Sequence, residues 1–277
     1  MPRPRVFALT LLAMLAFAGN SLLCRAAFTA SRIDAASFTA IRIVAGALAL
    51  WLIVRAKGGT HKPAGSWVSA LALFAYAAAF SFAYLSLTAA TGALLLFGAV
   101  QATMIGVGLW RGEGLRGWQI AGLACALCGL IGLLLPGLSA PPLRGSALML
   151  GAGIAWGVYS LRGKGAGDPL RVTAGNFLRA VAFAAVLSLA MLPSASLDAA
   201  GVGYAIASGA ITSGIGYAIW YTVLPALKAT SAATIQLSVP VIAALGGIVL
   251  LGEPPTLRLL LAAIAILGGI ALVIKSR

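Results

Sequence analysis

The sequence predicts an all-α integral membrane protein with ten transmembrane helices, arranged as two inverted five-helix repeats around a central cavity. Three observations lead to this prediction: an apolar composition, a series of apolar segments of membrane-spanning length, and a weak internal repeat. Hydrophobic residues make up 61% of the chain and charged residues 9%. A soluble globular domain carries roughly a quarter charged residues, so this chain has too few to cover a water-facing surface.

The apolar segments follow one another along almost the whole chain. Each is bounded by charges, Gly or Pro, and each is long enough to cross a bilayer, which takes about 20 apolar residues. The segment nearest the N-terminus has the composition of a signal peptide, but further spans follow it directly, so we expect it to be retained. The expected spans are 6–26, 36–55, 66–88, 91–110, 117–136, 145–163, 171–192, 200–224, 230–251 and 257–274.

The placement of basic residues predicts the orientation of these spans. If the N-terminus is cytoplasmic, thirteen of the nineteen Lys and Arg residues fall on the cytoplasmic side and four on the outer side. The positive-inside rule therefore predicts that both termini are cytoplasmic. The net charge of +14 is scattered between apolar segments and forms no block, so we expect no nucleic-acid partner.

The two glutamates of the chain, Glu113 and Glu253, indicate a duplication. Each follows a glycine at the end of a long apolar run, and they lie 140 residues apart, with Thr91 and Thr230 at nearly the same offset. Because each repeat would hold an odd number of spans, the second copy must be inverted in the membrane. A carboxylate favours the positive N-terminal end of a helix, so we expect each glutamate to cap the helix that follows it. The predicted repeats are 1–138 and 139–277.

Residues for chemistry are scarce at depth. No Asp or Glu lies inside an expected span, and the single histidine, His61, lies in a connection. Metal sites and acid–base catalysis need clusters of His and carboxylates. We therefore expect no catalytic residues, no metal site and no cofactor, and we predict that the chain is not an enzyme. Cys125 and Cys128, in "CALC", are interpreted as small side chains at a helix contact.

Inverted repeats are typical of secondary transporters, whose substrate site lies near the midplane between the halves. Several motifs support this: "FAGNSLLCR" with "WGVYSLRGK", "FTAIRIVAGALAL", and "TGALLLFGAVQ…WRGEGL" with "TSAATIQLSVPV…LLGEPP". With these motifs the whole chain resembles the EamA-domain family of the drug/metabolite transporter superfamily. In length and layout it is similar to bacterial amino-acid exporters of the YddG type.

The resemblance implies a ten-helix, basket-shaped carrier with a central cavity, which exports small metabolites across the bacterial inner (plasma) membrane. The sequence departs from the family pattern at Phe17, where the first repeat commonly has Trp.

Two arginines, Arg42 and Arg179, lie inside expected spans. Ionisable groups at such depth usually mark a transport pathway, so both are candidate contacts for a substrate carboxylate. The alternative is that each reaches its interface or bonds neighbouring carbonyls. The sequence leaves both interpretations open.

Aromatic and amide residues supply the other candidates for substrate binding. The tyrosines and tryptophans carry polar tips that hydrocarbon cannot satisfy, and Pro240 leaves the carbonyl of Gln236 without its helical donor. The alternatives are packing for the aromatic residues and interhelical hydrogen bonds for the amides. The candidates are Asn20, Tyr76, Tyr84, Gln101, Trp156, Tyr159, Trp220 and Gln236.

Together these features predict a carrier that exports small metabolites by alternating access, with amino acids, including neutral and aromatic ones, as substrates. Its partners are the substrate and the lipid bilayer. We expect a facilitator, because no span carries a carboxylate or histidine that could couple transport to protons. Two alternatives remain: an anion or sugar-phosphate antiporter that uses Arg42 and Arg179, and a non-transporting membrane scaffold subunit.

Overall fold

The computed structural model of the protein describes residues 2–58, 64–112, 117–137, 140–163, 166–227, 232 and 235–275. Every regular element in these ranges is a helix, as the composition predicts. Eight of the helices are long and apolar enough to cross a membrane, and α11 is a shorter apolar helix. The chain is therefore a multi-pass membrane protein. The α-helices are α1 (Arg3–Ala30), α2 (Ala35–Ala56), α3 (Trp67–Tyr84), α4 (Ala89–Trp110), α5 (Gly117–Leu134), α6 (Leu143–Gly163), α7 (Pro169–Ala190), α8 (Ala199–Ile206), α9 (Gly216–Val223), α11 (Ser238–Leu251) and α12 (Leu257–Lys275).

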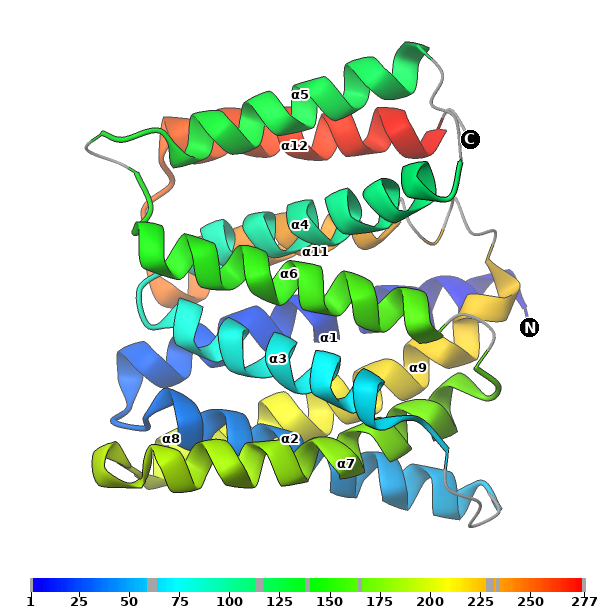
Figure 1. Ribbon diagram of the computed structural model, residues 1–277, viewed down its shortest axis with the longest axis vertical. Coiled ribbons are helices and arrows are strands. Elements are labelled where there is room, and N and C mark those ends of the chain that lie inside the picture. The colour runs from blue at the N-terminus through cyan, green and yellow to red at the C-terminus, as the bar shows by residue number, and fades with distance from the viewer. Residues whose placement is uncertain are drawn as a thin grey trace.

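The helices lie in layers across the long axis of the molecule (Figure 1). The pair α5 and α12 forms one edge, α4, α6 and α11 come next, α1, α3 and α9 follow, and α2, α7 and α8 form the other edge. The first residues of α1 and the last of α12 lie at the same end of the bundle. We call this the terminal end, and the end that holds Ala30 of α1, Ala89 of α4 and Leu251 of α11 the opposite end.

The rod formed by α8 and α9 has a wide turn in its middle. Residues Ala207–Ile215, called η2, form a π-helix between the two α-helices. Their sequence, "ASGAITSGI", is rich in Gly, Ser and Thr, which are weak α-helix formers. This turn packs closely on α2, where a Cβ on Gly209 would overlap the backbone carbonyl of Arg42. The π-helix was not predicted, and such turns are frequent at functional sites.

Carboxylates and hydroxyls cap the N-terminal ends of four helices. Asp34, Asp168 and Asp198 each accept a hydrogen bond from an N–H group in the first turn of the helix that follows, and Thr88 does the same for α4. Such caps satisfy donors that the helix itself leaves free. They therefore fix where α2, α4, α7 and α8 begin.

Glu253 has a different role from the predicted one. Gly252 ends α11 in the left-handed conformation, with φ of 66°, and the carboxylate of Glu253 turns back to accept from the N–H of Ala89, at 2.9 and 3.0 Å. It thus caps α4, whereas the hydroxyl of Thr256 accepts from the N–H of Leu259 in α12. The prediction that Glu253 caps the following helix is therefore wrong. Glu113 lies outside the described residues.

The segment expected as a span at 230–251 also differs from the prediction. Helix α11 begins only at Ser238, and Leu237 lies in a turn. Pro240 lies in the first turn of α11, where a missing N–H costs no helical hydrogen bond. The proline therefore lies just after a turn at Leu237, which separates α11 from the helical residues Ile235 and Gln236.

Candidate functional site

A cavity of about 640 Å³ lies inside the bundle. Gly108, Arg111, Gly163 and Gly167 line its mouth, and all four lie at the ends of α4, α6 and the connection to α7 at the terminal end. Among the described residues that line the cavity, none belongs to a helix turn at the opposite end. The cavity therefore opens at the terminal end and is closed at the opposite end. Its inner end is lined by Asn20, Ser21, Tyr76 and Phe80.

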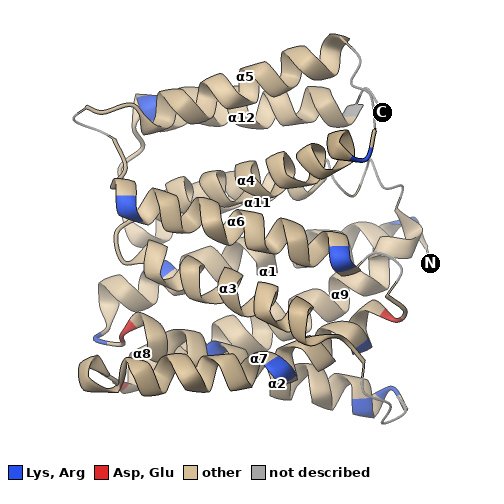
Figure 2. Cartoon of the chain, viewed as in Figure 1, with Lys and Arg blue, Asp and Glu red and all other residues tan. Residues whose placement is uncertain are grey.

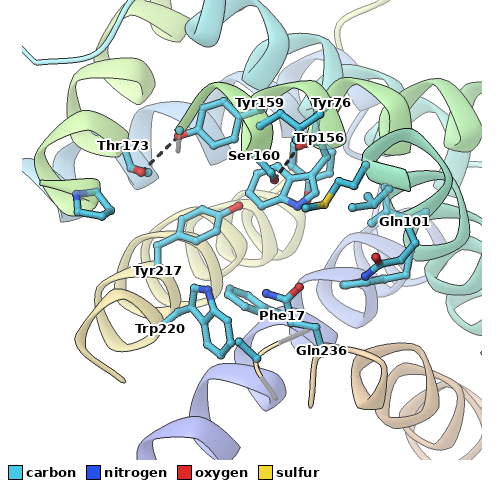
Figure 3. A pocket seen from close by; sticks show the side chains of 18 of the residues that line it. Phe17, Tyr76, Gln101, Trp156, Tyr159, Ser160, Thr173, Tyr217, Trp220 and Gln236 are labelled. Atoms are coloured by element: carbon cyan, nitrogen blue, oxygen red, sulfur yellow. Dashed lines mark hydrogen bonds between the residues drawn. The ribbon is translucent and has the colours of Figure 1, made fainter. Parts of the chain in front are cut away.

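Aromatic rings from three helices form one side of the cavity. Trp156 of α6 lies at the centre, with ring centroids 4.8 Å from Tyr76, 5.2 Å from Tyr159 and 5.5 Å from Tyr217. Trp156 and Tyr159 are three residues apart, so one face of α6 presents both. We call the rings of Tyr76, Trp156, Tyr159 and Tyr217 the aromatic wall, and Figure 3 shows these side chains around the cavity. Offset contacts of this kind fix the rings against one another.

Phe17 and Trp220 extend the same lining. The ring of Phe17 lies 5.7 Å from Tyr217 and 6.1 Å from Trp220, measured between centroids. Both side chains line the cavity. The residue that departs from the family pattern is therefore still an aromatic lining residue, although a smaller one that lacks the indole N–H of tryptophan.

The hydroxyl tips of the tyrosines near the mouth are held by polar side chains of α7. Tyr159 donates to the Thr173 hydroxyl at 3.3 Å, and that hydroxyl donates to Tyr221 at 3.1 Å. The amide of Asn176 donates to Tyr159 at 3.4 Å. The tyrosines are thus oriented from behind, which keeps their rings in place along the cavity.

Two glutamine amides face the cavity from other helices. Gln101 of α4 and Gln236, just before α11, both line it, and Figure 3 shows their amide groups directed towards the space beside the rings. Neither amide makes a hydrogen bond to another residue in the described part of the chain. An amide in an apolar setting needs a hydrogen-bond partner. Both groups are therefore available to a polar substrate group.

A hydrogen-bonded cluster closes the inner end of the cavity. Tyr76 accepts from the Asn20 amide at 3.2 Å and from Nη2 of Arg42 at 3.1 Å. The Asn20 carbonyl in turn accepts from the Ser208 hydroxyl of η2 at 2.6 Å. Arg42 is 2% exposed and its guanidinium lies 4.9 Å from the ring centroid of Phe80. It does not line the cavity, so it reaches a substrate only through Tyr76.

The structure separates Tyr84 and Arg179 from the other predicted residues. Tyr84 is fully buried and donates to the carbonyl of Ala89, between α3 and α4 at the opposite end. Arg179 donates to the carbonyls of Gly175 and Ala64. Neither side chain lines the cavity. The predicted residues that do line the cavity are Asn20, Tyr76, Gln101, Trp156, Tyr159, Trp220 and Gln236.

Several lining residues were missed from the sequence. Tyr217 and Tyr221 accompany Trp220 on α9, and Thr173 and Asn176 lie three residues apart on α7. The available signal was a polar residue on the same helix face as a predicted one, because residues three or four apart share a face. Applied to α7 and α9, this signal finds Asn176 from Arg179 and Tyr217 from Trp220, and a second step of three or four residues then reaches Thr173 and Tyr221.

Comparisons with known proteins agree with this architecture. Residues 143–275 match the EamA-like transporter family. The chain is 59% identical over 278 aligned residues to the uncharacterized protein PA1977 of Pseudomonas aeruginosa, an alignment that covers 100% of this chain and 97% of that protein.

A solved crystal structure of another protein superimposes with a TM-score of 0.69 at 22% identity, over 96% of this chain and 98% of that one. This likeness concerns the fold, which fits the drug/metabolite transporter fold implied by the motifs. The family match and the near full-length relative lead to one conclusion: the chain belongs to the EamA-like transporter family, whose members are membrane transporters of small molecules.

Proposed function

We propose that the protein exports amino acids, including neutral and aromatic ones, by alternating access. The observation that carries this proposal is the cavity of about 640 Å³, open at one end of the bundle and closed at the other. Its volume falls in the range of roughly 300–1,000 Å³ that is usual for small-molecule sites. Its lining combines an aromatic wall with free amides. The rings suit an apolar side chain, and Gln101 and Gln236 suit the polar groups of an amino acid.

The proposed transport cycle rests on two inverted repeats, 1–138 and 139–277. The helix packing supports the two repeats. Helix α6 packs against α3 and α4, and in the same way α1 packs against α8, α9 and α11. The remaining helices pair across the halves, α2 with α7 and α5 with α12. Gly112 and Gly252, at matching ends of α4 and α11, are both left-handed. Exchange between two arrangements of such repeats would expose the site to either side in turn.

The proposed location is the bacterial inner membrane, with both termini in the cytoplasm. Figure 2 supports this orientation, because more of the ribbon is coloured as Lys or Arg towards the terminal end than towards the opposite end. In this orientation the cavity would open to the cytoplasm, as an exporter requires for loading.

A reporter fused after Arg277 should be cytoplasmic. A cysteine at position 139 should react with an impermeant reagent outside cells, and one at Lys57 should not. Labelling of both ends of α5 from the same side would contradict the inverted repeats.

We further propose that transport is facilitated rather than proton-coupled. Among the described residues that line the cavity there is no Asp, Glu or His, and Glu113 and His61 lie outside the described residues. Proton coupling needs a group that changes charge on the path. In liposomes, labelled substrate should equilibrate without accumulation and should not respond to an imposed pH gradient. Accumulation that a protonophore abolishes would contradict this proposal.

Counterflow tests the substrate directly. Liposomes that contain the pure protein are loaded with unlabelled amino acid and diluted into a trace of the labelled compound. We expect transient uptake of neutral and aromatic amino acids, and none in protein-free liposomes or in those loaded with glucose. Exchange of phosphate or sugar phosphates without amino acids would favour the antiporter alternative. That alternative is less supported, because Arg179 bonds carbonyls outside the cavity.

A further inference from the structure

The inner end of the cavity holds a hydroxyl that is fully used as an acceptor. A tyrosine oxygen has two acceptor positions and one O–H to donate. In Tyr76 both acceptor positions are occupied, by Arg42 at 3.1 Å and by Asn20 at 3.2 Å. No described residue accepts the O–H of Tyr76. Because Tyr76 lines the cavity, this O–H is a donor left for a bound molecule.

The direction of these hydrogen bonds is fixed by the neighbours of Tyr76. Arginine has no acceptor, so Arg42 can only donate to the hydroxyl. The carbonyl of Asn20 already accepts from Ser208 at 2.6 Å and from Thr212 at 3.4 Å, so its NH₂ group faces Tyr76. Neither neighbour can accept the tyrosine proton in this arrangement.

A buried positive charge stands directly behind this donor. Arg42 is 2% exposed, and its Nη1 is buried without a hydrogen-bond partner among the described residues. Its surroundings are the rings of Tyr76 and Phe80. In the described part of the chain, the carboxylate of Glu253 forms its ion pair with Arg25 and not with Arg42. A buried cation without a carboxylate is unfavourable, so an anion at the inner end of the cavity would relieve an existing imbalance.

We propose that the inner end of the cavity is a carboxylate site. The O–H of Tyr76 donates to the substrate carboxylate, while Arg42 is a positioning residue that holds Tyr76 as a donor and supplies the balancing charge without touching the substrate. This inference rests on the proposed function and deepens it: the substrate enters with its carboxylate towards the closed end, and its side chain lies along the aromatic wall. Compounds that lack a carboxylate are poor ligands.

Matched pairs of probes test this assignment. Binding to the pure protein in detergent is measured by calorimetry for L-phenylalanine and L-phenylalaninamide, and for 3-phenylpropionate and its amide. We expect the wild type to bind each acid at least about tenfold more tightly than its amide, because a charge-assisted hydrogen bond is lost in the amide. Tyr76→Phe keeps the ring but removes the donor, so the ratio of acid to amide affinity should approach one while amide affinity changes little.

Two further variants separate a local effect from a general loss of structure. Arg42→Gln should reduce the acid-to-amide ratio, and Arg42→Lys, which keeps the charge, should retain most of it. Tyr204→Phe removes a tyrosine hydroxyl from α8 outside the cavity lining and should leave the ratio unchanged. If arginine variants fail to fold, the comparison of Tyr76→Phe with Tyr204→Phe still decides.

The outcomes distinguish this site from the proposed function. Equal affinity for acids and amides in the wild type, or an unchanged ratio in Tyr76→Phe, would overturn the carboxylate site even if amino acids are transported. Binding of 3-phenylpropionate but not of L-phenylalanine, with the ratio lost in Tyr76→Phe, would support the site and contradict amino-acid export. Failure of every carboxylate to bind folded protein would overturn the site.

Discussion

The two ends of the bundle are built in contrasting ways. At the opposite end, Arg25 of α1 forms an ion pair with Glu253 at 3.2 Å and donates to the carbonyl of Tyr84 at 3.1 Å. Glu253 also accepts from the N–H of Ala89. At the terminal end, the helix ends around Gly108 and Gly163 stand apart at the mouth of the cavity. One end is tied by charged contacts, and the other is open.

The contacts of the closed end would therefore hold most of the energy that separates two states of the proposed cycle. The contacts around Glu253 link α1, α3, α4 and the connection between α11 and α12, which come from both proposed repeats. In the proposed cycle, an outward-open state would break these contacts and gain equivalent ones at the terminal end. Contacts described there, such as Asn176 with Ser66 at 2.9 Å, tie α7 to the start of α3 without crossing the mouth. In the proposed transport cycle we expect the polar cluster around Glu253 to act as a latch that is released when this end opens.

The largest expected effect follows from weakening this latch with Glu253→Gln. The side chains of Arg25 and Glu253 are only 19% and 10% exposed, and removing one member of such a pair leaves the other poorly compensated. We expect a shift towards the outward-open state of about 10–100-fold, equal to about 1.4–2.7 kcal/mol. A cysteine at Ser21, in a background without native cysteines, should then react much faster with an impermeant reagent from the side of the opposite end.

A matched control for this prediction is Arg258→Gln. Arg258 also lies at the opposite end, but it donates to the carbonyl of Leu135 in an exposed position. It should leave the labelling rate nearly unchanged. If both variants label as slowly as the wild type, the latch is not what keeps this end closed.

A smaller effect is expected inside the cavity for Trp156→Ala. The variant removes three aromatic contacts of the aromatic wall, each of about 0.5–1.5 kcal/mol, and we expect transport to fall by about tenfold or more. Gln236→Ala should also reduce transport. The control is Trp118→Ala, because Trp118 is 73% exposed on α5. Uptake by liposomes, normalised to folded protein, measures the effect. Equal loss in both tryptophan variants, in step with the loss of folded protein, would indicate packing instead.

The smallest expected effect concerns Asp34, which joins α2 to the connection before α8 at the closed end. Partial burial raises the pKa of its carboxyl, but hydrogen bonds from Ser37, Ser196 and Ala36 outweigh this and lower it below the ordinary value. A carboxyl with a lowered pKa in the folded state stabilises the fold above its unfolded pKa of about 3.9. That stabilisation is lost as pH falls through the folded pKa.

Asp34→Asn should therefore lower the stability of the detergent-solubilised protein at pH 7 by less than about 1 kcal/mol, because the carboxyl is only partly buried and solvent screens its charge. Thermal unfolding followed by circular dichroism measures the difference, which should narrow as the pH falls below about 4. A difference that is independent of pH would mean that the charge of Asp34 contributes nothing and that only its shape matters.

The sequence predicted the membrane class and the helix positions well, because length and apolarity are local properties. It did not give the depth of side chains along a helix. Tyr76, Phe80 and Tyr84 share one face of α3, but the cavity ends at Phe80. Tyr84 lies one turn farther, against the backbone of Gly92. Periodicity identifies a face, and only the packing of neighbouring helices decides where along that face a cavity stops.

Long-range contacts account for the other differences. The contact of Glu253 with Ala89 spans 164 residues, and the bonds of η2 to Asn20 span 188 and 192. The π-helix Ala207–Ile215 is too short for its wider turn to appear as a hydrophobic period, so only the run of Gly, Ser and Thr in 207–215 hinted at it. For Arg42 the sequence indicated importance through depth alone. Its indirect position behind Tyr76 depends on the approach of α2 to α3, which single-sequence reasoning does not supply.

The close pairing of α5 with α12 has a consequence for how the protein is made. A Cβ on Gly122 would overlap the carbonyl of Gly269, and one on Gly269 would overlap that of Gly122, so the two backbones touch. Helix α5 obtains most of its packing from α12, which the ribosome completes after it. At about 5–20 residues per second, α5 waits in the bilayer for several seconds or more before its partner is synthesised. Helix α5 therefore lacks its packing partner until α12 has been synthesised. We expect the two halves to fold together when they are co-expressed as separate chains, and neither half to fold when it is made alone.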